Sequence, residues 1–186
     1  MSKSDTVRGL ALAASVVLAL AIPAVPAAAS IETYEAKAEA SDAAAMARFH
    51  MEEVFGDKEL KTGQYLWRNG AFSGPPRVVI SLSDQRAYLY RGDALVAVST
   101  ISTGTEKHPT PTGIFSVLQK EPMHRSQKYE NAPMPFMQQI DSYGVAMHAG
   151  HLPGFPASHG CIRLPSEFAK KLYSVTDLGA TVMIGT

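Results

Sequence analysis

The chain has a single cysteine, Cys161, and three histidines precede it closely, at positions 148, 151 and 159. A free thiol is only a few per cent thiolate near neutral pH. A nucleophilic cysteine therefore needs a neighbouring base, and a hydrogen-bond donor for the oxyanion that it creates. Imidazole is the usual base, because its pKa lies close to neutral. The pattern indicates nucleophilic acyl transfer at Cys161.

Residues beside Cys161 are suited to complete such a site. In an extended segment, His159, Cys161 and Arg163 point to the same side, because successive side chains alternate. Gly160 has no Cβ, which allows a tight path that would turn the amides of Gly160 and Cys161 toward an oxyanion. We expect Ser158 to hydrogen-bond the backbone of the turn, not to act as a nucleophile.

His148 is the candidate base, because it ends a predicted strand that could lie beside the segment of Cys161. His151 is the alternative for this role. A zinc site is a rival interpretation, since His148, His151, His159 and Cys161 supply four nitrogen and sulfur ligands. Their spacing matches no familiar zinc pattern, and a metal-bound thiolate would leave no free nucleophile, so we expect no metal. A buried structural cysteine is the third interpretation.

Residues 1–29 are predicted to be a signal peptide. Lys3 and Arg8 give a positive start, residues 10–22 form an uncharged apolar run, and small residues at 27–29 suit a cleavage site. The run is short for a bilayer core of about 30 Å, although an uncleaved anchor is the alternative. We therefore expect an exported protein of the periplasm or cell envelope that meets the membrane only transiently, through this segment. A lone cysteine in such a protein indicates a free reactive thiol or intermolecular pairing.

Charge and length narrow the class of protein. The chain carries 17 Lys and Arg against 17 Asp and Glu, so its formal net charge is zero. With no basic stripe and no polybasic cluster, we expect neither nucleic acid nor anionic lipid as a partner. The mature part, residues 30–186, is long enough for one domain with a hydrophobic core.

The elements before the main domain are predicted to be a helix and a connector. Residues 30–55 contain no Gly or Pro, and Met46, His50 and Val54 recur at four-residue spacing, which favours a helix. Ser41 is the expected N-cap, which leaves the first ten mature residues as a loose tail. Residues 56–76 are rich in Gly and Pro and predict a connector.

From Arg77 onward the apolar period changes to two and short runs are separated by glycine turns, which predicts an antiparallel sheet. The candidate strands lie near 78–83, 87–90, 94–103, 113–118, 137–140, 144–147 and 180–184. Residues 121–132 have no clear period and are expected to form an irregular excursion. Pro165 should open a short helix that Gly179 ends.

The predicted fold class is therefore mainly β. We expect an antiparallel, sandwich-like catalytic domain at residues 76–186 with one or two short helices, preceded by an N-terminal helical extension and connector at residues 30–75.

The segment Ser158-His159-Gly160-Cys161-Ile162-Arg163-Leu164 resembles the signature of the L,D-transpeptidase catalytic domain, the YkuD-type family. Four further segments agree with the family in order: 102–104, 109–115, 133–137 and 179–184. The likeness covers about residues 76–185, and residues 30–75 have no counterpart. The spacer between His148 and Ser158 is shorter than is usual in this family.

The resemblance implies roles for these residues. Cys161 corresponds to the acylated nucleophile and His148 to its general base, which the backbone carbonyl of Ala149 would orient. The amides of Gly160 and Cys161 correspond to oxyanion donors, and the supporting residues are Ser158, His159 and Arg163. The candidates for the substrate groove are Met134, Phe136, Tyr129 and His151.

The resemblance also implies a two-step exchange on peptidoglycan stem peptides that needs no cofactor. Cys161 would attack the carbonyl of an L-centre of diaminopimelate, or of a related diamino acid, and expel the terminal D-alanine. An acceptor amine would then take the thioester and form a 3–3 crosslink or another attached product. Carbapenem-type β-lactams should acylate the same thiol. Two alternatives are an L,D-carboxypeptidase or other peptidoglycan hydrolase on the same scaffold, and a non-catalytic wall-binding module.

Overall fold

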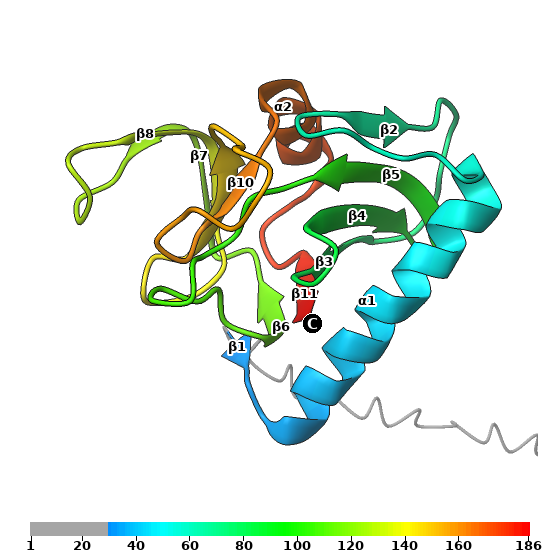
Figure 1. Ribbon diagram of the computed structural model, residues 1–186, viewed down its shortest axis with the longest axis horizontal. Helices are drawn as coiled ribbons and strands as arrows, with labels where there is room; N and C mark the ends of the chain where they lie inside the picture. Colours follow the sequence, from blue (N-terminus) through cyan, green and yellow to red (C-terminus); the bar gives the residue numbers. More distant parts are fainter. Residues whose placement is uncertain (1–29) are drawn as a thin grey trace, which may run out of the picture.

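The computed structural model describes residues 30–186, so the predicted signal peptide lies outside the described residues. A seven-stranded sheet, a four-stranded sheet and two helices make up this part of the chain (Figure 1). The prediction of a mainly β domain with short helices and an N-terminal helix is confirmed. No helix within residues 30–186 is long and apolar enough to cross a membrane.

The larger sheet has the strand order β1-β6-β11-β3-β4-β5-β2. Its strands are β1 (Ser30–Ile31), β2 (Tyr65–Trp67), β3 (Pro76–Ser81), β4 (Arg86–Arg91), β5 (Ala94–Thr100), β6 (Gly113–Ser116) and β11 (Thr181–Gly185). Neighbouring strands are antiparallel except β3 and β11, which are parallel because the rest of the domain, not a hairpin, connects them. Residues 30–75, predicted as an extension, thus contribute β1 and β2 to this sheet.

The smaller sheet has the strand order β10-β9-β8-β7. Its strands are β7 (Gln119–Arg125), β8 (Pro133–Gln139), β9 (Ala146–Ala149) and β10 (Ile162–Leu164). Strands β7 and β8 form a hairpin that takes in most of residues 121–132, which we predicted to be irregular. The prediction failed because β7 buries no residue and so carries no alternating apolar pattern.

Helix α1 (Tyr34–Phe55) begins well before Ser41, the predicted N-cap. The observed N-cap is Thr33, whose Oγ1 accepts a hydrogen bond from the Ala36 amide at 3.3 Å. The segment predicted to be a loose tail therefore forms strand β1 and the first turns of α1.

Helix α1 lies on one face of the large sheet, beside β11, β3 and β6 (Figure 1). Its buried face consists of Ala36, Ala40, Ala44, Ala47 and Met51. Met46 and Val54, which suggested a different face, are 51% and 37% exposed. Small side chains allow close approach: a Cβ added to Gly185 of β11 would lie 2.4 Å from the carbonyl oxygen of Ala40.

The main hydrophobic core is shared between the two sheets and helix α2 (Ser166–Val175). From α2, Phe168 is fully buried and contacts the ring of Trp67 edge-on, with centroids 5.9 Å apart. The helix ends before Gly179, because Thr176 leaves the helical region and its Oγ1 donates to the carbonyl of Leu172 at 2.7 Å.

Candidate active site

The small sheet turns one face to the main core and the other to a cavity. In β9, Met147 and Ala149 belong to the main core, so His148 between them points to the opposite face. Strand β10 pairs in parallel with β9 and places Arg163 opposite His148. Cys161 lies two residues before Arg163 and faces the same way. Strand alternation thus brings the predicted thiol and the predicted base to one face.

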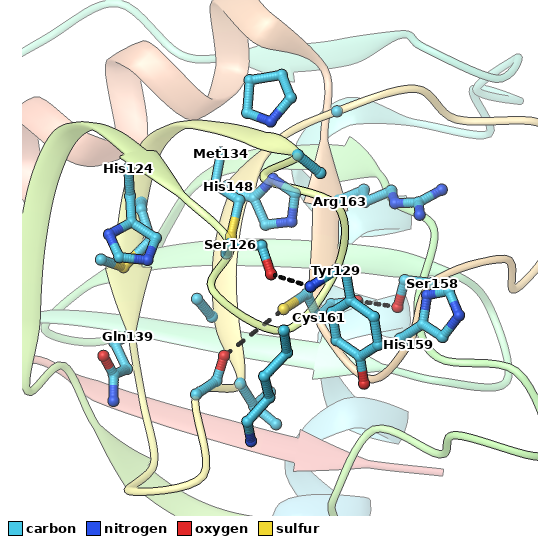
Figure 2. A pocket seen from close by; sticks show the side chains of 18 of the residues that line it. His124, Ser126, Tyr129, Met134, Gln139, His148, Ser158, His159, Cys161 and Arg163 are labelled. Atoms are coloured by element: carbon cyan, nitrogen blue, oxygen red, sulfur yellow. Dashed lines mark hydrogen bonds between the residues drawn. The ribbon is translucent and has the colours of Figure 1, made fainter.

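A cavity of about 630 Å³ lies on this face (Figure 2). The motif residues that line it are His148, Ser158, His159, Cys161 and Arg163. The predicted groove residues that line it are Tyr129, Met134 and His151. Residues of the sequence motif and residues of the β7–β8 hairpin therefore line the same cavity.

His148 is held in one tautomer by its neighbour Ala149. The side chain is buried, and its Nδ1 lies 2.9 Å from the carbonyl oxygen of Ala149. A carbonyl can only accept, so Nδ1 carries the proton and Nε2 keeps a lone pair. Burial is the main cause that lowers the pKa of His148 below 6.5; the bond to Ala149 opposes it, and the charges of Arg163 and His124 add to it. At neutral pH the imidazole is neutral and can accept a proton at Nε2.

Cys161 is protonated at rest. Burial raises the pKa of its thiol above the ordinary value of 9.0, although a backbone hydrogen bond from Ala146 works against that rise. The Sγ atom lies 3.8 Å from the carbonyl oxygen of Gly144, which can accept the S–H (Figure 2). The resting site therefore combines a neutral thiol with a neutral imidazole.

The turn that carries Gly144 is braced by Asp141. This buried carboxylate accepts hydrogen bonds at one oxygen from the amides of Tyr143, at 2.9 Å, and Val145, at 2.8 Å. Because these amides flank Gly144, they fix the carbonyl that the Cys161 thiol meets. Asp141 thus fixes the backbone beside the thiol, and its negative charge also contributes to the raised pKa of Cys161.

The neutral pair predicts how Cys161 reacts with a neutral alkylating agent. Iodoacetamide attacks through the thiolate, so its rate should keep rising from about pH 6 to about pH 9. The raised pKa of Cys161 moves thiolate formation toward alkaline pH. Intact-mass measurement of the alkylated fraction against time, at each pH, gives the rate. A rate that is level between about pH 6 and about pH 8 would indicate a preformed thiolate–imidazolium pair and contradict this prediction.

The backbone path to Cys161 is fixed by two hydroxyl groups. Ser158 Oγ accepts from the Gly160 amide at 3.1 Å and donates to the Cys161 carbonyl at 2.5 Å. Thr110 Oγ1 donates to the Gly160 carbonyl and accepts from the Gly104 amide, both at 2.8 Å. The Gly160 amide, predicted to be an oxyanion donor, is thus already bonded to Ser158. Of the two predicted amides, that of Cys161 is the remaining candidate.

His159 lies at the rim of the cavity and not on a shared strand face with Cys161. Gly160 has φ +113°, in the left-handed region that favours glycine, and this turn ends the extended path that we predicted. The His159 ring stacks on Tyr129, with centroids 4.4 Å apart, and lies 4.8 Å from the ring of His108. These ring contacts therefore join residues 158–161, the loop before β10 that we call the cysteine loop, to the turn between β7 and β8.

The prediction that Phe136 lines the groove is wrong. Its φ of +56° and the missing N–H of Pro122 across the hairpin interrupt the ladder of β7 and β8. The Phe136 ring instead lies against Tyr173 of α2, with centroids 6.0 Å apart. Met134 and Met137, three residues apart, both line the cavity as a result.

Glu121 and His124 line the cavity although the sequence did not predict them there. Glu121 and His124 come from β7, and Glu121 Oε2 lies 2.8 Å from His124 Nδ1. Their segment has no apolar period, so only the tertiary pairing of β7 with β8 reveals that they face the cavity. The His–Glu spacing of three residues is a weak signal by itself.

The described residues offer no metal centre. Within residues 30–186, no three side chains of His, Cys, Asp or Glu are grouped so that they could hold a metal ion. The zinc interpretation of the three histidines and Cys161 therefore finds no ligand set there.

The fold and the site define a mainly β domain that places a cysteine thiol and an oriented imidazole on one face of a small sheet. The family model of the L,D-transpeptidase catalytic domain (YkuD) matches residues 75–184, more than half of the chain. The chain belongs to this family.

Solved structures share this fold. An L,D-transpeptidase from Stackebrandtia nassauensis is similar with a TM-score of 0.56 and 22% identity, over 74% of this chain and 65% of that one. One from Mycobacterium tuberculosis H37Rv has a TM-score of 0.53 and 26% identity, over 59% and 57%. A further L,D-transpeptidase, in complex with imipenem, has a TM-score of 0.55 and 17% identity, over 66% and 77%. The chain thus spans less than two thirds of the first two structures, and no curated protein matches its sequence.

Proposed function

We propose that this protein is an L,D-transpeptidase that moves an acyl group from a peptidoglycan stem peptide to an amine through a thioester on Cys161. The observation that carries the proposal is the orientation of His148. Its Nδ1 is bound by Ala149, so its free Nε2 can serve the thiol on the same face of the sheet. Family membership supplies the class of reaction.

The first step forms the thioester. Cys161 Sγ attacks the carbonyl of the donor's diamino acid while His148 Nε2 takes the thiol proton. The Cys161 amide is the candidate donor to the resulting oxyanion. The bond between the carbonyl carbon and the nitrogen of D-alanine then breaks, and the imidazolium gives its proton to that nitrogen.

The second step releases the acyl group. A neutral amine attacks the thioester, and His148 takes a proton from the attacking nitrogen as the new amide bond forms. The bond from carbon to sulfur breaks, and the proton returns to the thiolate. The directions of the two pKa shifts suit this step, because burial favours the return of both groups to their neutral forms.

A reaction on peptidoglycan would take place outside the cytoplasm, so we propose a periplasmic or cell-envelope location, which the predicted signal peptide at residues 1–29 supports. Carbapenems are the proposed inhibitors, because they too would acylate Cys161. The similar L,D-transpeptidase solved in complex with imipenem supports this part of the proposal.

The products made from a stem-peptide donor test the function. The mature protein is incubated with a disaccharide tetrapeptide, and the products are separated by chromatography and identified by mass spectrometry. We expect free D-alanine and a dimer with a 3–3 crosslink, and neither product from Cys161→Ala. D-alanine with only a shortened peptide would identify an L,D-carboxypeptidase. Binding of the donor without any product would identify a wall-binding module.

A further inference from the structure

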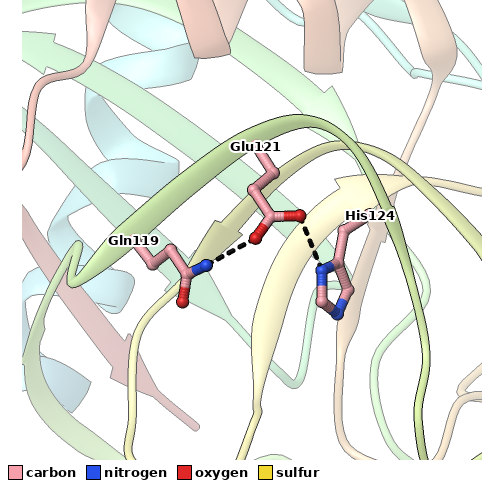
Figure 3. A network of polar contacts seen from close by, with 3 residues as sticks. All are labelled: Gln119, Glu121 and His124. Carbon is pink, nitrogen blue, oxygen red and sulfur yellow. Dashed lines mark hydrogen bonds and ion pairs between the residues drawn. The ribbon is translucent and has the colours of Figure 1, made fainter.

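Glu121, Gln119 and His124 form a polar network in the cavity that the proposed mechanism does not use (Figure 3). Gln119 Nε2 donates to Glu121 Oε1 at 2.5 Å, and His124 Nδ1 lies 2.8 Å from Glu121 Oε2. An ionised carboxylate has about four acceptor sites, so each oxygen of Glu121 keeps room for one further donor. The network therefore holds the carboxylate in place without saturating it.

Glu121 is the only acidic residue among the described residues that line the cavity. Two cationic side chains, Arg163 and Lys128, also line it, and their charges act on Cys161. A ligand ammonium in this cavity therefore has a single anionic partner, and that partner stands apart from the thiol, on β7. The side chains of Glu121 and His124 are 35% and 27% exposed, so a ligand can reach the carboxylate in a partly shielded setting.

Strand register gives the distance between this carboxylate and the reacting end of the cavity. Glu121 lies opposite Met137, and the next residue, Gln138, lies opposite Met147, so Met137 is level with His148. Two strand spacings, about 10 Å in all, separate the backbones of Glu121 and His148, and Cys161, immediately before β10, lies one spacing further on. The side chains of Glu121 and Cys161 both line the cavity and shorten this gap of about 15 Å. A four-carbon side chain that ends in an ammonium reaches about 6 Å from its Cα, and the donor backbone at the thiol spans the rest.

We propose that Glu121, oriented by Gln119 and His124, binds the ammonium at the end of the donor's diamino-acid side chain while the backbone carbonyl of that residue lies at Cys161. This inference rests on the proposed function and adds a specificity-determining residue to it. An apolar side chain of the same length would cover the carboxylate and leave its two free acceptor sites without a donor. The protein should therefore select donors whose third residue carries a primary ammonium.

Two tetrapeptide donors that differ only at the third residue test the inference. One carries lysine and the other norleucine, which has the same carbon chain without the ammonium. We expect wild type to prefer the lysine donor by about 10- to 100-fold in kcat/KM for D-alanine release, mainly through KM. Glu121→Gln should abolish the preference by lowering kcat/KM for the lysine donor toward the value for the norleucine donor. Glu53→Gln, an exposed position on α1, should keep the full preference and serves as the matched control.

A third donor makes the test independent of any substitution. Nε-acetyl-lysine keeps the length of lysine but carries no charge, so wild type should use it as poorly as norleucine. Equal use of all three donors by wild type, or an unchanged lysine preference in Glu121→Gln, would overturn the inference and leave the proposed function standing. No D-alanine release by wild type from any donor would instead refute the proposed function, and the inference with it.

Discussion

Replacing His148 with glutamine is expected to slow acylation of Cys161 by a carbapenem about 100- to 10,000-fold. A glutamine amide can still donate to the Ala149 carbonyl, but it offers no basic lone pair for the thiol proton. Because burial raises the pKa of Cys161, the thiol cannot compensate by ionising at neutral pH. The rate of adduct formation, followed by intact mass, measures the effect, and thermal unfolding shows whether the variant is folded.

His151→Gln separates the two candidate bases. His151 is exposed at the same cavity. If His148 is the base, His151→Gln should slow acylation by less than about tenfold. A large loss in His151→Gln together with a small one in His148→Gln would transfer the role to His151.

Replacing Thr110 with valine is expected to destabilise the protein and to slow acylation. The Thr110 hydroxyl is buried and bonds both the Gly104 amide and the Gly160 carbonyl at 2.8 Å. Valine has nearly the same shape but leaves both backbone groups without this partner, at a cost of about 1–3 kcal/mol each. A loosened Gly160 also displaces Cys161, and we expect acylation to fall about 10- to 100-fold.

Thr112→Val is the matched control for Thr110→Val. Thr112 is half-buried two residues further on, and its hydroxyl makes no hydrogen bond to another described residue. Urea unfolding gives the free energy of unfolding of both variants, and intact mass gives their acylation rates. Equal behaviour of the two variants would contradict the role of Thr110 in positioning the cysteine loop.

The sequence predicted those elements whose pattern is local. Strands β3 to β5 are short runs rich in β-branched, aromatic and other apolar residues, mostly buried on both faces, and their hairpin turns carry Gly or polar residues, so both strands and turns were recognisable. Strand β7 was not predicted, because it is polar and faces solvent on one side and a cavity on the other. The extent of α1 was underestimated because its buried face is alanine, a residue that gives little apolar contrast along the chain.

At the candidate site too, residues in a local motif were predicted, and residues that reach the site through long-range contacts were not. Cys161 and His148 were predicted from a short segment whose residue types signal chemistry by themselves. Thr110 and Glu121 were not placed at the site, because they reach it through contacts between segments far apart in the chain. The error at Phe136 came from a left-handed backbone at a bulky residue, which no residue preference anticipates.

The mass of the enzyme during its first turnover tests the proposed thioester on Cys161 most directly. Wild-type protein is mixed with a tetrapeptide donor, without an added acceptor, and quenched in acid after short times. We expect an adduct on Cys161 equal to the donor minus D-alanine, formed slowly in His148→Gln and absent in Cys161→Ala. Release of D-alanine by Cys161→Ala at the wild-type rate would contradict the thioester mechanism, because the reaction would then proceed without the thiol.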